Sequence, residues 1–196
     1  MKGIGLKNKI VCDIGCGTGL VTLTSILLGA DKVIAMDINE EALLYTQVAV
    51  ENLLHTYPQF KTCNVEYKQF DIKDESSFMP NCNFAIMSDV TYYKDLARIS
   101  ANRAFEMMIT GAEVLVTDPG RDNRNVFLET LKELSGTNGA LPFSISKESM
   151  EIEPKEVTMS KLWAAQANFL QSKVKVHEVT QSNALPEYID GYSLWL

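Results

Sequence analysis

Five aspartates stand at or directly after short apolar stretches, and a glycine-rich turn accompanies the first of them. They are Asp13, Asp37, Asp71, Asp89 and Asp118. The turn lies in "VCDIGCGTGL", residues 11–20, and holds Gly15, Gly17 and Gly19. Glycine allows tight turns and a close approach of a ligand to the backbone. Together with carboxylates that accept hydrogen bonds, this turn indicates a site for a nucleoside-containing ligand.

The spacing of the glycines argues against a dinucleotide. Dinucleotide-binding turns read G-x-G-x-x-G, whereas this turn reads G-x-G-x-G and places Leu20 where the last glycine is expected. Asp37, after the second apolar stretch, is placed to accept hydrogen bonds from both hydroxyls of a ribose. Asp71, after Phe70, is placed for an adenine amino group. The structural alternatives are a helix-capping role for Asp37 and a loop-capping role for Asp71.

Alternating strands and helices over residues 9–118 must position these residues. Strands are predicted at "KIVCDIG", "KVIAMDI", "NVEYKQFD", "CNFAIMSD" and "AEVLVTD". Helices are predicted over residues 18–29, from the capping residue Asn39 to about Leu54, and over residues 94–108. Continuous apolar strands between helices are typical of a parallel sheet covered on both faces. The carboxyl ends of its strands share one edge, so we expect the five aspartates to converge there.

The chain is less regular after "TDPGRDNRN". A helix over residues 123–134, a loop at "SGTNG", a helix at "SKLWAAQANFLQ" and strands at "KVKVHEVTQ" and "GYSLWL" are predicted. The last two strands can pair as an antiparallel hairpin at the sheet edge. The predicted fold class is therefore α/β: a Rossmann-like, doubly wound, mostly parallel seven-stranded sheet with an antiparallel C-terminal strand. We expect a single domain over residues 1–196 with an insertion near residues 136–158.

Composition excludes several classes of function. A length of 196 residues, 46% hydrophobic and 22% charged, suits one soluble globular domain. No apolar run approaches the roughly 20 residues that span a bilayer, and a net charge of −7 opposes generic nucleic-acid binding. Cys12, Cys16, Cys63 and Cys82 form no C-x-x-C pair and are expected to be reduced structural thiols. We expect a cytoplasmic protein without a metal, although a nuclear or organellar location stays open.

Four segments carry a resemblance to a known superfamily. "VCDIGCGTG", "VIAMDIN", "QFD" and "SDVTYY" resemble, in order and approximate spacing, the motifs of class I seven-strand S-adenosylmethionine-dependent methyltransferases. The resemblance implies S-adenosyl-L-methionine as the cofactor and Asp13 as the residue that orients the turn or the cofactor's amino group. It also implies that Asp37 holds the ribose and Asp71 the adenine. The implied cofactor-binding set is Asp13, Gly15, Cys16, Gly17, Gly19, Asp37, Ile38, Phe70, Asp71 and Ser88.

The segment "SDVTYY" bears on the acceptor of the methyl group. Methyltransferases of base amines carry an N-P-P-Y-like run here, whereas D-V-T-Y resembles the D-x-x-Y signature of a group of protein-lysine methyltransferases. "DPGR", residues 118–121, is similar to a motif of the electron-transfer-flavoprotein β-subunit lysine methyltransferases in that group. The implied catalytic residues are Asp89, which holds the amine, and Tyr92, which bounds its channel. A packing role at a helix start is the alternative for Tyr92 and Tyr93.

A protein lysine is thus the expected acceptor and a protein the expected partner. Two alternatives stay open: a small-molecule N- or O-methyltransferase whose pocket is shaped by residues 136–158, and a non-catalytic S-adenosylmethionine-binding or scaffold protein. The resembling families usually carry a longer segment before the glycine turn, often with a tryptophan motif. Here the tryptophans, Trp163 and Trp195, lie near the other end. This departure favours the non-catalytic alternative, whereas the intact acids and D-V-T-Y oppose it.

Overall fold

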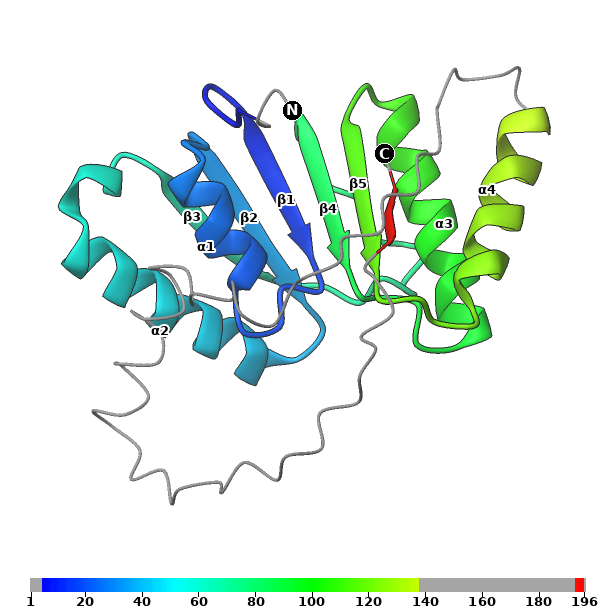
Figure 1. The fold of residues 1–196 in the computed structure, drawn as a ribbon, viewed down its shortest axis with the longest axis horizontal. Helices are drawn as coiled ribbons and strands as arrows, with labels where there is room; N and C mark the ends of the chain where they lie inside the picture. The colour runs from blue at the N-terminus through cyan, green and yellow to red at the C-terminus, as the bar shows by residue number, and fades with distance from the viewer. Residues whose placement is uncertain (1–4, 138–192, 196) are drawn as a thin grey trace, which may run out of the picture.

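The computed structural model describes residues 5–137 and 193–195, whose strands form a single sheet (Figure 1). The strands are β1 (Ile10–Ile14), β2 (Lys32–Asp37), β3 (Asn64–Gln69), β4 (Phe84–Ser88), β5 (Glu113–Asp118) and β6 (Ser193–Trp195). Their order is β3-β2-β1-β4-β5-β6. The first five strands pair in parallel, and β6 pairs antiparallel with β5.

Helices cover both faces of this sheet (Figure 1). They are α1 (Leu20–Leu27), α2 (Glu40–Thr56), α3 (Lys94–Ile109) and α4 (Arg124–Thr137), with a short 3-10 helix η1 (Pro58–Phe60) after α2. Successive residues of β1 point to opposite faces. Val11 packs in one apolar cluster with Leu23 of α1, whereas Cys12 packs in a second cluster with Ala101 of α3. The predicted doubly wound α/β fold is therefore confirmed.

The order in which successive strands are added to the sheet changes direction at β1, which lies between β2 and β4. Strands β2 and β3 extend to one side of β1, and β4 and β5 extend to the other side. In such sheets the ligand crevice lies beyond the carboxyl ends of the strands at this switch point. Four predicted acids end or follow a strand there, and Asp13 lies one residue before the end of β1. This edge is the lower edge of the sheet in Figure 1.

Several predicted elements need correction. Helix α1 begins at Leu20 and not at residue 18, because Gly19 has a φ of 87° and cannot join a right-handed helix. Helix α4 continues to Thr137, through residues predicted to start a loop. The described residues contain six strands and not seven. The predicted strand "KVKVHEVTQ", the helix "SKLWAAQANFLQ" and residues 138–158 of the predicted insertion lie outside the described residues.

None of the helices within residues 5–137 has both the length and the apolar character needed to cross a bilayer.

Candidate functional site

The glycine turn after β1 is tied to the neighbouring strand. Gly15, Gly17 and Gly19 have φ angles of 76°, 54° and 87°, in the left-handed region that favours glycine. The backbone N–H groups of Gly15 and Cys16 both donate to the carbonyl oxygen of Met36 in β2, at 2.8 and 2.9 Å. The turn is therefore held in place by main-chain bonds, and at Gly17 a β-carbon would meet open space.

Helix α2 supports the turn through Thr46, which sequence reasoning missed. The buried Thr46 hydroxyl lies 3.1 Å from the carbonyl oxygen of Gly17 and 3.4 Å from the sulfur of Cys16, so it can donate to either. Thr46 shares the buried face of α2 with Val50 and Leu53, at helical spacing. The sequence feature that could have identified Thr46 is its place as a polar residue on the otherwise apolar buried face of this helix.

Replacing Gly19 with alanine is expected to destabilise the fold by about 2–4 kcal/mol. A β-carbon at Gly19 would lie only 3.0–3.1 Å from Thr46, and the φ of 87° adds backbone strain. Gly29→Ala is the matched control, because Gly29 has a φ of 89° but open space at the β-carbon position. Urea unfolding should show a loss for Gly19→Ala that exceeds the loss for Gly29→Ala. Equal losses would show that Thr46 does not constrain the turn.

Asp37 ends β2 and contacts the turn directly. Its Oδ2 accepts the N–H of Gly17 at 3.0 Å, and its Oδ1 accepts the N–H of Asn39 at 3.0 Å. The predicted N-cap of α2 is confirmed, since the Asn39 side chain accepts the N–H of Glu41 at 2.9 Å. A carboxylate offers about four lone-pair sites, so Asp37 retains acceptor capacity for ribose hydroxyls beside these two bonds.

Asp13 is a buried acid within β1, 1% exposed. Its Oδ2 accepts the hydroxyl of Thr22 in α1 at 2.6 Å, another contact that the sequence analysis did not identify. Its Oδ1 is buried and has no hydrogen-bond partner within the described part of the chain. Burial raises the pKa of Asp13 to about 7, although the bond from Thr22 lowers it. This orphaned oxygen suits a ligand that brings a hydrogen-bond donor or a positive charge.

The raised pKa of Asp13 predicts a pH-dependent stability. Between its ordinary value of 3.8 and its folded value of about 7, Asp13 binds its proton more tightly in the folded protein than in the unfolded chain. The resulting stability is complete below the unfolded pKa and is lost as the pH rises through the folded pKa.

Relative to Asp13→Asn, the wild-type protein should therefore lose about 2.5 kcal/mol of unfolding free energy between pH 5 and pH 8. Urea unfolding of both proteins across this range measures the difference. Unfolding free energies that change with pH in the same way in both proteins would contradict a raised pKa of Asp13.

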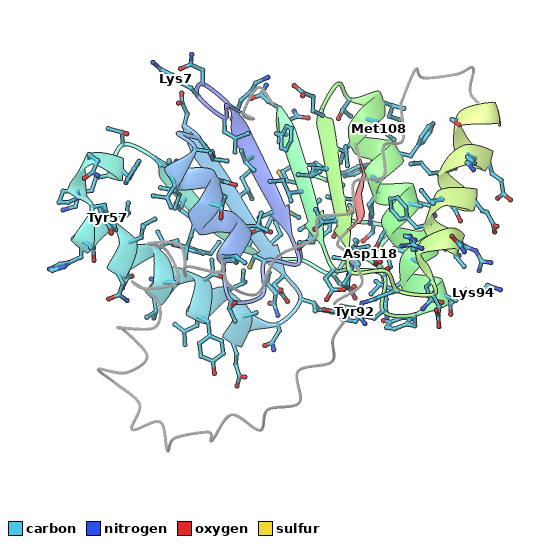
Figure 2. The ribbon with its side chains drawn as sticks, viewed as in Figure 1. Lys7, Tyr57, Tyr92, Lys94, Met108 and Asp118 are labelled. Carbon is cyan, nitrogen blue, oxygen red and sulfur yellow. The ribbon has the colours of Figure 1, made fainter. Side chains whose placement is uncertain are left out.

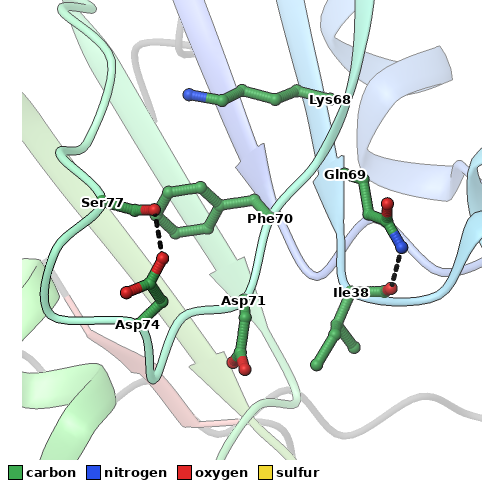
Figure 3. A pocket seen from close by; sticks show the side chains of 7 residues that line it. All are labelled: Ile38, Lys68, Gln69, Phe70, Asp71, Asp74 and Ser77. Carbon is green, nitrogen blue, oxygen red and sulfur yellow. Dashed lines mark hydrogen bonds between the residues drawn. The ribbon is translucent and has the colours of Figure 1, made fainter.

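A pocket of about 300 Å³ opens beside the ends of β2 and β3 (Figure 3). Its lining comprises Ile38, Lys68, Gln69, Phe70, Asp71, Asp74 and Ser77. Ile38 is 58% exposed, whereas Phe70 is buried and also belongs to the core. Asp71 accepts the N–H of Lys73 at 2.9 Å through Oδ1, so it caps a turn as well as lining the pocket. The pocket combines apolar walls with carboxylates, as a base with an exocyclic amine requires.

A second group of site residues lies at the end of β4. Ser88 accepts the hydroxyl of Thr117 at 3.0 Å, which links β4 to β5. Asp89 follows with a φ of 55°, a left-handed conformation that aspartate adopts more readily than most residues. Both oxygens of Asp89 accept hydrogen bonds from Arg121, from Nε at 2.5 Å and from Nη2 at 2.8 Å. The Arg121 guanidinium carbon also lies 4.3 Å from the centre of the Tyr92 ring.

Asp118 orients Arg121 from the end of β5. Its buried Oδ1 accepts the N–H groups of Gly120 and Arg121, each at 2.7 Å, and its Oδ2 accepts the Thr91 hydroxyl. Figure 2 shows Asp118 and Tyr92 near the same edge of the sheet. The segment "DPGR" was singled out in the sequence, but no site role was predicted for Arg121. The sequence feature that could have identified Arg121 is its position three residues after the aspartate that ends a strand.

All predicted site residues lie at the carboxyl end of the sheet, in two groups. The predicted cofactor residues from Asp13 to Asp71 surround the ends of β1, β2 and β3. Asp89 and Tyr92 lie between β4 and α3, beside β5. The first group offers a glycine turn with open space at Gly17, hydrogen-bond acceptors and a pocket. The second group offers a carboxylate and an aromatic ring that together hold a cation.

The first part of the chain matches known methyltransferase sequences. Residues 2–73 match the family model "Ribosomal protein L11 methyltransferase (PrmA)". Over 44 residues the chain is 48% identical to the ribosomal protein L11 methyltransferase of Vibrio vulnificus (strain YJ016), which covers 22% of this chain and 15% of that protein. Over 46 residues it is 50% identical to that of Acinetobacter baumannii (strain SDF), covering 24% and 15%. The matched stretch is thus a small part of the length of each relative.

A solved structure resembles this fold. The S-adenosylmethionine-dependent methyltransferase from Mesorhizobium loti superposes with a TM-score of 0.55 at 14% identity, covering 98% of this chain and 92% of that one. The chain therefore has the class I S-adenosylmethionine-dependent methyltransferase fold. The fold and the family match imply S-adenosyl-L-methionine as the cofactor. The open space beside Gly17, the orphaned oxygen of Asp13 and the pocket beside Asp71 fit that molecule.

Proposed function

We propose that this protein transfers a methyl group from S-adenosylmethionine to the side-chain amine of a lysine in a protein partner. The observation that carries the proposal is the pairing after β4, where Asp89 and Tyr92 hold the cationic side chain of Arg121. A lysine ammonium is also a cation that pairs with carboxylates and aromatic faces. The same two residues therefore suit a lysine acceptor.

The cofactor residues have separate roles in this proposal. When bound, S-adenosylmethionine supplies an electrophilic methyl group on a positively charged sulfur. Asp37 accepts hydrogen bonds from the ribose, and Asp13 offers its orphaned oxygen to the amino group. Asp71 accepts a hydrogen bond from the base amine. The remaining cofactor residues line the ligand, and they are Gly15, Cys16, Gly17, Gly19, Ile38, Phe70 and Ser88.

The acceptor residues position the amine and keep it reactive. A lysine ammonium must lose a proton to solvent before its nitrogen can attack, and the positively charged sulfur of the cofactor, when bound, would favour that loss by lowering the pKa of the lysine. Arg121 leaves Asp89 when the lysine takes its place. Asp89 then orients the amine, and Tyr92 bounds its approach and accepts a hydrogen bond through its hydroxyl. Placing the nitrogen about 3–3.5 Å from the methyl carbon supplies much of the acceleration in such transfers.

The matches to relatives support the cofactor residues of the proposal more directly than its acceptor residues. The family match over residues 2–73 includes the cofactor residues up to Asp71 and ends before Asp89. The relatives are named for methylation of ribosomal protein L11, which favours a protein acceptor here. The proposed assignment to the D-x-x-Y lysine group is supported by "DVTY" and by the contacts of Asp89 and Tyr92 with Arg121.

Radiolabelled S-adenosylmethionine and a cell lysate test the acceptor class. We expect labelled protein bands whose hydrolysis releases methylated lysine, and we expect an excess of S-adenosylhomocysteine to suppress the label. Label confined to small molecules would favour a metabolite methyltransferase. Absence of any label, with cofactor binding intact, would favour a non-catalytic binding protein.

A further inference from the structure

The loop that follows β3 forms one wall of the pocket and is folded on itself. Residues 71–79 contribute Asp71, Asp74 and Ser77 to the lining (Figure 3). The N–H of Asp74 donates to the carbonyl oxygen of Asp71 at 3.1 Å, and the N–H of Ser77 donates to that of Asp74 at 3.0 Å. The Asp74 carboxylate accepts the hydroxyls of Ser76 and Ser77, at 2.6 and 2.5 Å. These bonds shape the loop, but they do not attach it to the rest of the fold.

Arg103 in α3 makes that attachment. Its Nε donates to the carbonyl oxygen of Ile72 at 3.1 Å, and its Nη2 donates to the carbonyl oxygen of Asp74 at 2.5 Å. Arg103 is only 8% exposed. Its guanidinium carbon also lies 5.8 Å from the centre of the Phe70 ring, which lines the pocket. One buried side chain therefore holds two carbonyl groups of the loop and contacts a pocket wall.

Glu106 compensates the charge of Arg103 and holds the far end of the loop. Its Oε2 accepts a hydrogen bond from Nη1 of Arg103 at 2.8 Å, one helical turn away. Its Oε1 accepts the N–H of Met79 at 3.3 Å. A buried arginine is tolerated when its charge is paired and its donors are bonded. The two residues thus clamp the loop near its start, at its middle and at its end.

We propose that Arg103, supported by Glu106, is a positioning residue for the base of the cofactor. Arg103 holds residues 71–79 against α3, so that the wall formed by Asp71, Asp74 and Ser77 exists before the ligand arrives. A loop without this clamp must become ordered when the ligand binds, and that cost reduces affinity. The inference rests on the assignment of the pocket to adenine and is independent of the identity of the methyl acceptor.

Calorimetry with S-adenosylhomocysteine and with adenosine tests the role of Arg103 on the full chain. Arg103→Met should weaken both ligands about 10- to 30-fold and by the same factor, because both ligands carry the base. Arg98→Met is the matched control, since Arg98 lies on the same helix with a side chain 52% exposed and a surface ion pair of 3.7 Å to Asp95. It should change either affinity less than about twofold.

Hydrogen exchange provides a readout that a general loss of stability would not reproduce. In Arg103→Met the amides of residues 72–79 should exchange faster, with unchanged exchange in β1 and β2. If Arg103→Met does not fold, Arg103→Lys keeps the charge but not the fork of donors, and it should weaken both ligands about three- to tenfold.

Unchanged affinity for both ligands in a folded variant would overturn the proposal, as would a loss for S-adenosylhomocysteine without a loss for adenosine. Failure of the wild-type protein to bind either ligand would overturn it together with the cofactor assignment. Absence of lysine methylation, with binding intact, would refute only the proposed acceptor.

Discussion

Asp37→Ala is expected to weaken S-adenosylmethionine binding by at least about 150-fold. The variant loses the charged acceptor for two ribose hydroxyls, and such hydrogen bonds contribute about 1.5–3 kcal/mol each. It also loses the bond from Gly17 N–H to Asp37 Oδ2, which holds the glycine turn at 3.0 Å. Isothermal calorimetry with S-adenosylmethionine or S-adenosylhomocysteine measures the change.

Asp31→Ala is the control for this experiment. Asp31 also accepts a backbone hydrogen bond, from Asn8 at 3.2 Å, but it precedes β2 and so lies at the opposite end of that strand. Its replacement should leave the affinity within about twofold. Unchanged cofactor affinity in Asp37→Ala would refute the placement of the ribose at the end of β2.

Asp89→Asn should abolish methyl transfer and spare cofactor binding. We expect at least about a 100-fold loss of kcat/KM on the protein acceptor, because the variant no longer orients the amine by charge. Cofactor affinity should change less than about threefold, since the pairing partner of Asp89 is Arg121 and not a residue of the glycine turn. Turnover on the labelled protein from the lysate, together with calorimetry, separates the two effects.

Arg121→Met is the matched variant at the same pair. It frees Asp89 for the acceptor, and an ion pair with side chains 34% and 38% exposed is weak enough to open. The variant should therefore keep turnover and lower the KM for a lysine-bearing acceptor by up to about fivefold. Retained turnover in Asp89→Asn, or loss of turnover in both variants, would contradict a direct role of Asp89 on the amine.

Local patterns in the sequence accounted for most of the sheet and for the location of the site. The apolar stretches around Cys12, Ile34 and Ile86 each became a strand, because continuous apolar residues are buried when helices cover both faces of a sheet. The predicted start of α3 at Lys94 is confirmed. The convergence of the acids also followed, because parallel strands place their carboxyl ends at one edge.

Boundaries that depend on a single backbone conformation were harder to predict. The start of α1 moved to Leu20 because Gly19 adopts a left-handed φ, which glycine permits but does not require. The end of α4 at Thr137 includes Gly136, which the sequence pattern placed in a loop. Helical propensity is a weak guide at such ends, since tertiary packing of the helix decides how far it extends.

The amino-acid sequence alone indicated the strand, turn and helix pattern of residues 9–134, the glycine spacing that argues against a dinucleotide, and the edge where the acids meet. These follow from residues that are neighbours along the chain. The tertiary structure decided which side chains those acids contact: Thr22 for Asp13, Gly17 for Asp37 and Arg121 for Asp89. The register between β4 and β5, with Ser88 opposite Thr117, brings Asp89 within reach of Arg121 across 32 residues of chain.

The clamp from Arg103 to Ile72 and Asp74 likewise depends on how α3 packs beside the pocket loop. Such pairings have no local signature, because they are selected by the packing of the whole core and not by residue spacing.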